Sequence, residues 1–238
     1  MPRYFLSSDV YWCETNDSVV FLNVPTGKYL AIDKSLLQHL ARFVDGWPQG
    51  SLSSTDKAES CTPANLDELV AAGLITTKRE AGKPASATSA RPVEVIPPAG
   101  LAELQGVLGV RHRLSFVACA VYVTTMLTLF RLRPLVKRLE LARGSAHVHD
   151  RQHIDMHHIA RLVGAFLRLR PWLYTAKNHC LTDSLTLAIF LRRWGVPATF
   201  VMGVATKPFA AHAWVQVTGT VLNDTLENVQ AYVPIIAV

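Results

Sequence analysis

The sequence predicts an α+β chain of two domains, on three observations. Short β-rich runs and amphipathic helical segments share the first 80 residues, and a stretch of small residues and prolines follows them. The C-terminal part passes from a helical pattern to short apolar runs typical of strands. We therefore expect one domain over residues 1–80, a linker over 81–100 and a second domain over 101–238.

Residues 1–80 have the pattern of a small winged-helix-like domain. Three β-rich runs are separated by turn residues, namely Val10–Cys13, Ser18–Asn23 and Lys28–Ile32. Asp33 suits the N-cap of a helix whose apolar residues form one stripe, namely Leu36, Leu37, Leu40 and Phe43. A second helix is expected from Asn65 to Gly73, and Leu74–Thr76 favours a returning strand.

Charge is divided unequally between the two expected domains. Residues 1–80 hold 7 Lys and Arg against 10 Asp and Glu, a net charge of −3, and the remaining residues carry +9 of the total of +6. Winged helices often bind DNA, but an acidic domain binds phosphates poorly. We therefore expect no nucleic-acid partner. The basic excess suits either an acidic partner or, more simply, solvated arginines on helix faces.

The segment from Leu101 to Arg170 is helical by pattern. Its apolar run Phe116–Phe130 is 15 residues long and contains three threonines. Because this is short for a membrane span, we expect a buried helix, with an interfacial or membrane helix as the alternative. The N-terminus lacks a basic stretch followed by an apolar core and a cleavage site, so no secretory signal is expected. The four cysteines, Cys13, Cys61, Cys119 and Cys180, show no C-x-x-C spacing, which favours reduced thiols in the cytoplasm.

The most informative segment runs from Cys180 to Asp224. Apolar residues at helical spacing follow Cys180, and Gly195 and Pro197 end that helix, so we expect the helix to begin at or beside the thiol. The runs 198–204 and 213–217 predict two strands, with His212 at the entry to the second. A tight turn at Thr218 and Gly219 then leads to a short strand ending at Asp224, which places His212 and Asp224 close together across the hairpin.

A Cys, a His and an Asp in this arrangement are the parts of a thiol hydrolase. The nucleophile is a thiolate, and a helix N-terminus or a nearby imidazole lowers the ordinary thiol pKa of about 8.5. A carboxylate at the second imidazole nitrogen fixes the tautomer and the ring direction. Each residue also has a plainer interpretation: Cys180 as a buried apolar residue, His212 as a strand-end histidine and Asp224 as a turn residue.

The residues around this triad carry a family resemblance. The run Cys180–Leu185, the Gly203–Val204 pair, the Ala211–Trp214 run (AHAW) and the Val221–Asp224 run (VLND) resemble the transglutaminase-like cysteine peptidase of lasso-peptide biosynthesis. This is the B protein of microcin-type clusters, which removes the leader from a ribosomally made precursor. The close resemblance covers roughly Ala160–Asp224. Asp183 departs from it, because many family members carry a basic residue there, and this bears on how local charge tunes the thiol.

The resemblance implies a papain-like or transglutaminase-like domain with Cys180 as nucleophile, His212 as base and Asp224 as its orienter. It implies no cofactor and no metal for cleavage. The partners it implies are the precursor peptide and an ATP-dependent macrolactam synthetase. Two other functions stay open: acyl transfer on the same triad, and a leader-binding adaptor without catalysis.

The N-terminal domain resembles the precursor-recognition element of peptide-modifying enzymes, in which the leader adds as a strand beside the third strand and packs against the last helix. The leader-binding residues implied are Lys28, Tyr29, Leu30, Ala31, Ile32, Leu66, Leu69 and Val70. The plainer alternative is a structural domain with an ordinary edge strand.

A histidine cluster suggests a different chemistry. Its members are His147, His149, His153, His157 and His158, and three of them share a helix face if the helix begins early enough. Paired His at this spacing can bind zinc. No Cys lies among them, so we expect an exposed polar helix face rather than a metal site.

Overall fold

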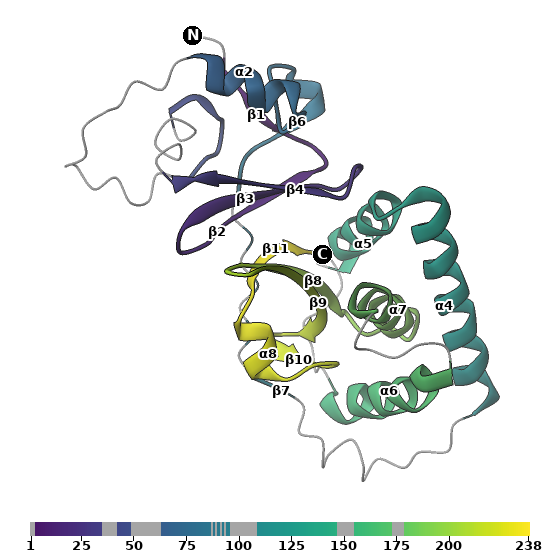
Figure 1. Cartoon of the computed structure of the whole chain (residues 1–238). Coiled ribbons are helices and arrows are strands. Elements are labelled where there is room, and N and C mark those ends of the chain that lie inside the picture. The colour runs from purple at the N-terminus through teal and green to yellow at the C-terminus, as the bar shows by residue number, and fades with distance from the viewer. Residues whose placement is uncertain are drawn as a thin grey trace. The chain divides into compact units, whose positions relative to one another are not determined.

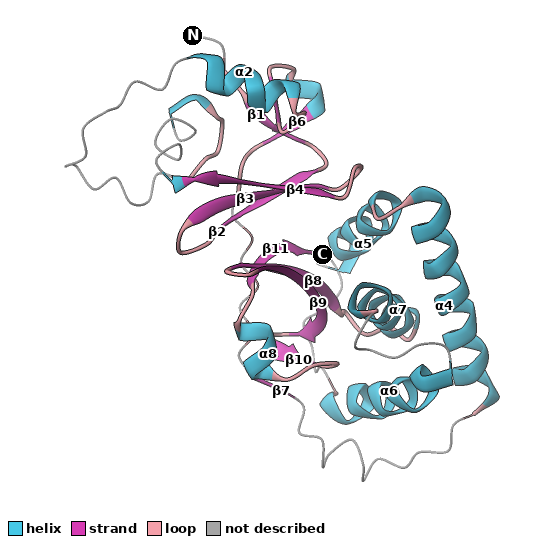
Figure 2. Ribbon diagram, in the orientation of Figure 1, coloured by secondary structure: helices cyan, strands magenta, loops and turns pink. Residues whose placement is uncertain are grey.

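The computed structural model describes residues 3–34, 42–48, 63–86, 88, 90, 92, 94–95, 109–146, 155–172 and 179–238. The chain divides into two compact units, residues 1–88 and 89–238. Both units contain helices and strands (Figures 1 and 2). The chain therefore has the α+β composition that the sequence predicts.

The first unit contains two three-stranded antiparallel sheets. One has the order β2–β3–β4, with β2 at Val10–Glu14, β3 at Ser18–Asn23 and β4 at Lys28–Asp33. These strands match the three predicted runs to within one residue. The other sheet has the order β5–β1–β6, with β1 at Phe5–Ser7, β5 at Ile75–Thr76 and β6 at Gly82–Lys83.

The described helix α2 of this unit spans Pro63–Ala71 and begins two residues before the predicted start at Asn65. Gly73 follows its end with a φ of +69°, the left-handed conformation that often ends helices. A short 3-10 helix, η2 (Arg79–Ala81), precedes β6. Most of the helix expected after Asp33 lies outside the described residues, and Arg42 and Phe43 are helical.

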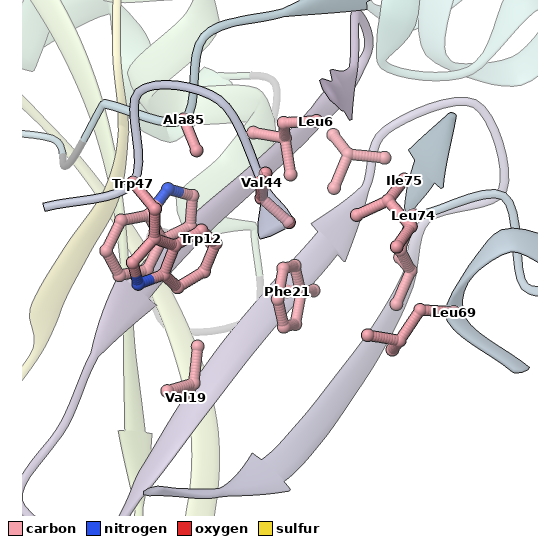
Figure 3. Close-up of a cluster of buried hydrophobic side chains, with 11 residues drawn as sticks. Leu6, Trp12, Val19, Phe21, Val44, Trp47, Leu69, Leu74, Ile75 and Ala85 are labelled. Atoms are coloured by element: carbon pink, nitrogen blue, oxygen red, sulfur yellow. The ribbon is translucent and has the colours of Figure 1, made fainter. Parts of the chain in front are cut away.

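The first unit has its own apolar core (Figure 3). Trp12 of β2 stacks on Trp47 with ring centroids 4.0 Å apart. Phe21 of β3 packs at 6.1 Å from the same indole. Leu69 of α2 and Ile75 of β5 belong to the same cluster, so the core joins the helix to both sheets. A shared core of this kind is what makes the unit a domain.

Several described residues of the predicted linker over 81–100 belong to the cores or sheets of the two units. Gly82 and Lys83 pair with β1, and Ala85 is buried in the first core. Ala90 is buried in a core cluster of the second unit, where β7 (Glu94–Val95) pairs with β10. Composition suggested a free tether because alanines bury little surface each. Here Ala85 and Ala90 are nonetheless buried among core side chains.

The second unit contains a five-stranded sheet in the order β11–β8–β9–β10–β7. The long central strands are β8 (Thr199–Thr206) and β9 (Phe209–Val217), and shorter strands flank them: β10 (Thr220–Val221) and β11 (Val233–Ala237). A five-residue helix, α8 (Leu226–Gln230), lies between β10 and β11 in the chain. Thr218 and Gly219 both have positive φ, 50° and 93°, so the predicted β9–β10 turn is tight.

Helix α7 (Cys180–Arg193) lies between this sheet and the other helices (Figure 2). These are α4 (Val110–Phe130), α5 (Arg133–Ala146) and α6 (Met156–Leu169), and a 3-10 turn, η3 (Arg170–Trp172), follows α6. Phe166 of α6 contacts both Phe116 of α4 and Phe190 of α7. The helix that carries the thiol is thus packed on both sides, which fixes its position.

Helix α4 differs from the prediction in length and in burial. It has 21 residues, because it begins at Val110 rather than at Phe116. One face packs on the domain through Phe116, Cys119, Ala120 and Val123, but only 28% of its most apolar stretch is buried. Val110, Leu114, Val117 and Val121 are exposed along the other face. Within the described part of the chain, α4 is the one helix long and apolar enough to cross a membrane.

Candidate active site

Cys180 is the first residue of α7, as the sequence predicts. Its thiol is half-buried, whereas the other described cysteines, Cys13 and Cys119, are buried. A hydrogen bond with His212 lowers the pKa of Cys180. Burial opposes this effect, and the backbone N–H groups of Ala213 and Leu181, which donate to the sulfur, add to it. The net direction is downward, toward the thiolate that acts as a nucleophile.

His212 lies in the interior of β9 rather than at its entry, because β9 begins at Phe209. Its Nε2 donates to Oδ2 of Asp224. Burial by itself lowers the pKa of an imidazole, but the hydrogen bonds with Asp224 and Cys180 outweigh it and raise the pKa of His212 to about 9. The ring lies near two aromatic rings, with centroids 5.1 Å from Tyr232 and 6.3 Å from Trp214.

Asp224 follows β10 and precedes α8. Its Oδ1 accepts the Thr225 N–H at 2.7 Å, and both of its oxygens accept from the side-chain amide of Asn228 at 3.0 Å. Burial tends to raise the pKa of Asp224, but the bonds from His212, Asn228 and Thr225 lower it overall. Asp224 therefore stays a carboxylate next to the imidazole.

Sequence reasoning missed Asn228, which shares the carboxylate of Asp224 with His212. A signal for its placement exists, because Thr225 caps α8 by accepting the backbone N–H of Asn228 at 3.3 Å. A threonine at a helix N-cap holds the residue three positions later in the first turn. That cap sets the backbone from which Asn228 reaches Asp224.

The arrangement supports acid–base chemistry on a thiol. The lowered pKa of Cys180 and the raised pKa of His212 favour a thiolate–imidazolium pair up to a pH of about 9. The thiolate can attack a carbonyl carbon, and the imidazolium can protonate a leaving amine. The backbone N–H of Cys180 at the helix start is the expected oxyanion donor. Asn178, which lies close in the sequence, is outside the described residues.

Gly203 of β8 is the cross-strand partner of His212. A Cβ on Gly203 would come within 2.8 Å of the Tyr232 Cβ and 2.9 Å of the Trp214 ring. We expect Gly203→Ala to lower the free energy of unfolding by about 1–3 kcal/mol, because overfilling a packed site forces neighbouring groups to move. Urea unfolding of the two proteins measures this. Equal stabilities would show that Tyr232 and Trp214 can give way at no cost.

The leader-binding residues expected in the first unit differ in accessibility. β4 is an edge of its sheet, and Lys28, Leu30 and Ala31 are exposed along it. Val70 of α2 is exposed, but Leu69 is only 7% exposed and belongs to the core. The side chain of Leu69 is thus used in core packing, and the leader-binding role of these residues stays a prediction. Ile32 and Leu66 are partly buried against the same core.

Of the histidine cluster, His147, His149 and His153 lie outside the described residues. His157 and His158 open α6, where their backbone N–H groups donate to Asp155 at 2.9 and 3.1 Å. Among the residues that the structure describes, no group of three or more His, Cys, Asp or Glu side chains is placed to hold a metal ion. The carboxylate of Asp155 serves as a helix cap instead.

Comparison with known proteins identifies the superfamily of the second unit. Residues 119–237, half of the chain, match the transglutaminase-like superfamily. The chain belongs to the transglutaminase-like superfamily. The match covers Cys180, His212 and Asp224, so this transglutaminase-like domain includes all three residues of the site.

The chain is also similar to the microcin J25-processing protein McjB of Escherichia coli, with 46% identity over 48 residues. That similarity spans 20% of this chain and 23% of McjB, so it covers less than a quarter of either protein. Together with the superfamily match, it confirms the resemblance to the B proteins of lasso-peptide biosynthesis. No solved structure matches this transglutaminase-like chain significantly.

Proposed function

We propose that this protein is a cysteine peptidase that removes the leader from a ribosomally made lasso-peptide precursor. The observation that carries the proposal is the contact of His212 with both the Cys180 thiol and the Asp224 carboxylate. The similarity to a microcin-processing protein supports a peptide precursor as substrate. Cys180 attacks the scissile carbonyl, His212 transfers the proton to the leaving amine, and Asp224 orients His212.

Incubation of the purified protein with the precursor peptide encoded beside its gene tests this proposal. We expect mass spectrometry to detect free leader and free core, whose masses add up to that of the precursor plus one water. Acyl transfer on the same triad would instead give an amine adduct, because a thioester intermediate accepts amines as well as water. If the precursor stays intact after prolonged incubation with this protein, both without and with the synthetase, the peptidase proposal is wrong and a leader-binding adaptor without catalysis is the remaining function.

Within this proposal, residues 1–80 form a winged-helix-like domain that recognises the leader. An edge strand offers unpaired N–H and C=O groups, and an added peptide strand gains affinity from them and selectivity from neighbouring side chains. The exposed edge β4 and α2 of the described part supply such elements. Holding the leader on one domain raises its concentration at the thiol of the other.

We expect Leu30→Asp to weaken leader binding by roughly tenfold, because Leu30 is 41% exposed on β4 and an aspartate there does not favour an apolar leader side chain. Fluorescence anisotropy with a labelled leader peptide measures this in the full chain. The matched control is Leu129→Asp, a 69% exposed leucine of α4 in the second unit. Equal affinities for Leu30→Asp and wild type would remove β4 from the binding surface.

The proposal places the protein in the cytoplasm with an ATP-dependent macrolactam synthetase as partner, since freeing the core amine prepares it for ring closure. Ribosomal synthesis supplies the precursor in that compartment. Copurification of the two proteins from co-expressing cells tests the partnership. Separate elution at all protein concentrations would contradict it.

A further inference from the structure

Three polar side chains beside the proposed triad form a hydrogen-bonded network. Asp183 and Ser184, three and four residues after Cys180, are 2% and 0% exposed on the same helix. Asn223 immediately precedes Asp224. Its Nδ2 donates to Asp183 Oδ2 at 3.2 Å and to Ser184 Oγ at 3.0 Å. The network therefore joins the helix of the thiol to the residue beside the carboxylate.

Ser184 also connects α7 to the strand that carries the imidazole. Its hydroxyl donates to the carbonyl oxygen of Ala213 at 2.9 Å, and the N–H of Ala213 donates to the sulfur of Cys180. Both backbone polar groups of Ala213 are thus bonded to α7. Since Ala213 follows His212 directly, these two bonds set where the imidazole lies along the helix.

Asn223 ends the β9–β10 ladder with its side chain. Up to Leu222 the pairing is through the backbone, with the Leu222 N–H donating to the Val215 carbonyl at 2.9 Å. The Val215 N–H then donates to Asn223 Oδ1 at 2.9 Å. Because a side chain takes over from the backbone here, the chain can leave β9 and turn Asp224 toward His212.

Asp183 anchors the network at an energetic cost. Burial raises the pKa of Asp183, and bonds from Asn223 and Arg170 oppose this. The Arg170 Nη1 lies 3.4 Å from its Oδ2, while its Oδ1 has no hydrogen-bond partner among the described residues. A buried carboxylate with one unbonded oxygen contributes little to stability. A role in geometry explains its presence better.

We propose that Ser184 and Asn223, anchored by Asp183, are positioning residues that hold the thiol of Cys180 against the imidazole of His212 and thereby keep the thiol reactive. The inference rests on the proposed peptidase mechanism and adds residues that touch no substrate. Among the described charged and titratable groups, His212 contacts the thiol, Asp224 contacts His212, and Arg170 contacts Asp183 within the network, while His179 is adjacent to Cys180 in the chain.

The test follows alkylation of Cys180 by iodoacetamide in the full chain, from about pH 5 to about pH 10, with mass spectrometry of the peptide that carries Cys180. The alkylation rate rises with pH as the thiol ionises, and in the wild type we expect the pH midpoint of this rise to lie well below that of an ordinary thiol. Ser184→Ala and Asn223→Ala are expected to raise this midpoint by about one pH unit or more, a loss of roughly tenfold in rate near pH 6.

The matched control is Thr186→Val, which removes another fully buried hydroxyl from α7. Among the described residues, Thr186 Oγ1 donates only within the helix, to the Thr182 carbonyl at 2.7 Å. We expect its midpoint to equal that of the wild type, whatever its thermal stability. If Asn223→Ala fails to fold, the midpoint of Ser184→Ala alone tests the inference, because that variant loses a single hydroxyl and is expected to fold.

The outcomes separate two failures. An ordinary thiol midpoint in the wild type would contradict the activated thiol on which the proposed function depends. A low midpoint in the wild type that stays low in both Ser184→Ala and Asn223→Ala would overturn the positioning inference alone. If Thr186→Val raises the midpoint as much as Ser184→Ala and Asn223→Ala do, the effect is a general one of packing in α7, and the positioning inference is overturned as well.

Discussion

Replacing Cys180 with alanine is expected to lower the rate of leader cleavage by roughly 10⁴-fold or more and to leave leader binding unchanged. The thiol is the only group in the proposed triad that forms a bond to the substrate, so the remaining imidazole has no nucleophile to activate. Leader binding should persist because the surface proposed for it belongs to the first unit. Precursor cleavage followed by mass spectrometry, with anisotropy on a labelled leader, measures both quantities.

The control for this substitution is Cys119→Ala. Cys119 is 3% exposed, and burial raises its pKa, so its thiol is neither accessible nor ionised. We expect this variant to keep nearly full cleavage. Cleavage by Cys180→Ala at the wild-type rate would exclude Cys180 as nucleophile, whatever its contacts with His212.

Asp224→Asn is expected to lower cleavage by about 10²–10⁴-fold and to narrow the pH range of activity. An amide of the same shape carries no charge, so it favours the imidazolium less. In the wild type the thiolate–imidazolium pair forms as pH rises through the lowered pKa of Cys180 and is lost as pH rises through the His212 pKa of about 9. In the variant we expect the upper limit to move toward the ordinary histidine pKa of about 6.5.

The same pKa values predict the direction of a stability effect. The raised pKa of His212 stabilises the folded state fully below about pH 6.5, and this contribution disappears as pH rises through about 9. The lowered pKa of Asp224 acts in the opposite sense, because its contribution is lost as pH falls through the folded-state value. Asp224→Asn should reduce both contributions.

Cleavage rates and urea unfolding as functions of pH measure these effects. Asp155→Asn is the matched control, since Asp155 is also a carboxylate that accepts N–H bonds, at the N-cap of α6. Its pH profile for cleavage should equal that of the wild type. An unchanged upper limit in Asp224→Asn would mean that Asp224 does not set the protonation of His212.

Predictions from sequence succeeded where local pattern decides the structure. The start of α7 at Cys180 follows from apolar spacing and from the glycine and proline after its last turn. That His212 and Asp224 lie near each other follows from counting residues back from the Thr218–Gly219 turn, because an antiparallel register is set by its turn.

Predictions were incomplete where distant residues decide. Composition indicated a tether at 81–100, yet Ala85 and Ala90 are buried in two different cores. The apolar run 116–130 indicated a buried helix, yet α4 exposes Val117 and Val121. In both cases burial depends on which elements pack nearby, and hydrophobic composition alone does not specify that.

The amino-acid sequence by itself determined the kinds of elements, their order, and the succession of thiol, imidazole and carboxylate along helix, strand and turn, because spacing and turn residues act locally. Only the tertiary structure decided that Ala213 bonds through both of its backbone groups to α7, and that Asn223 completes the link between α7 and β9. Those contacts join residues up to 40 positions apart, and the folded packing alone brings them within hydrogen-bonding distance.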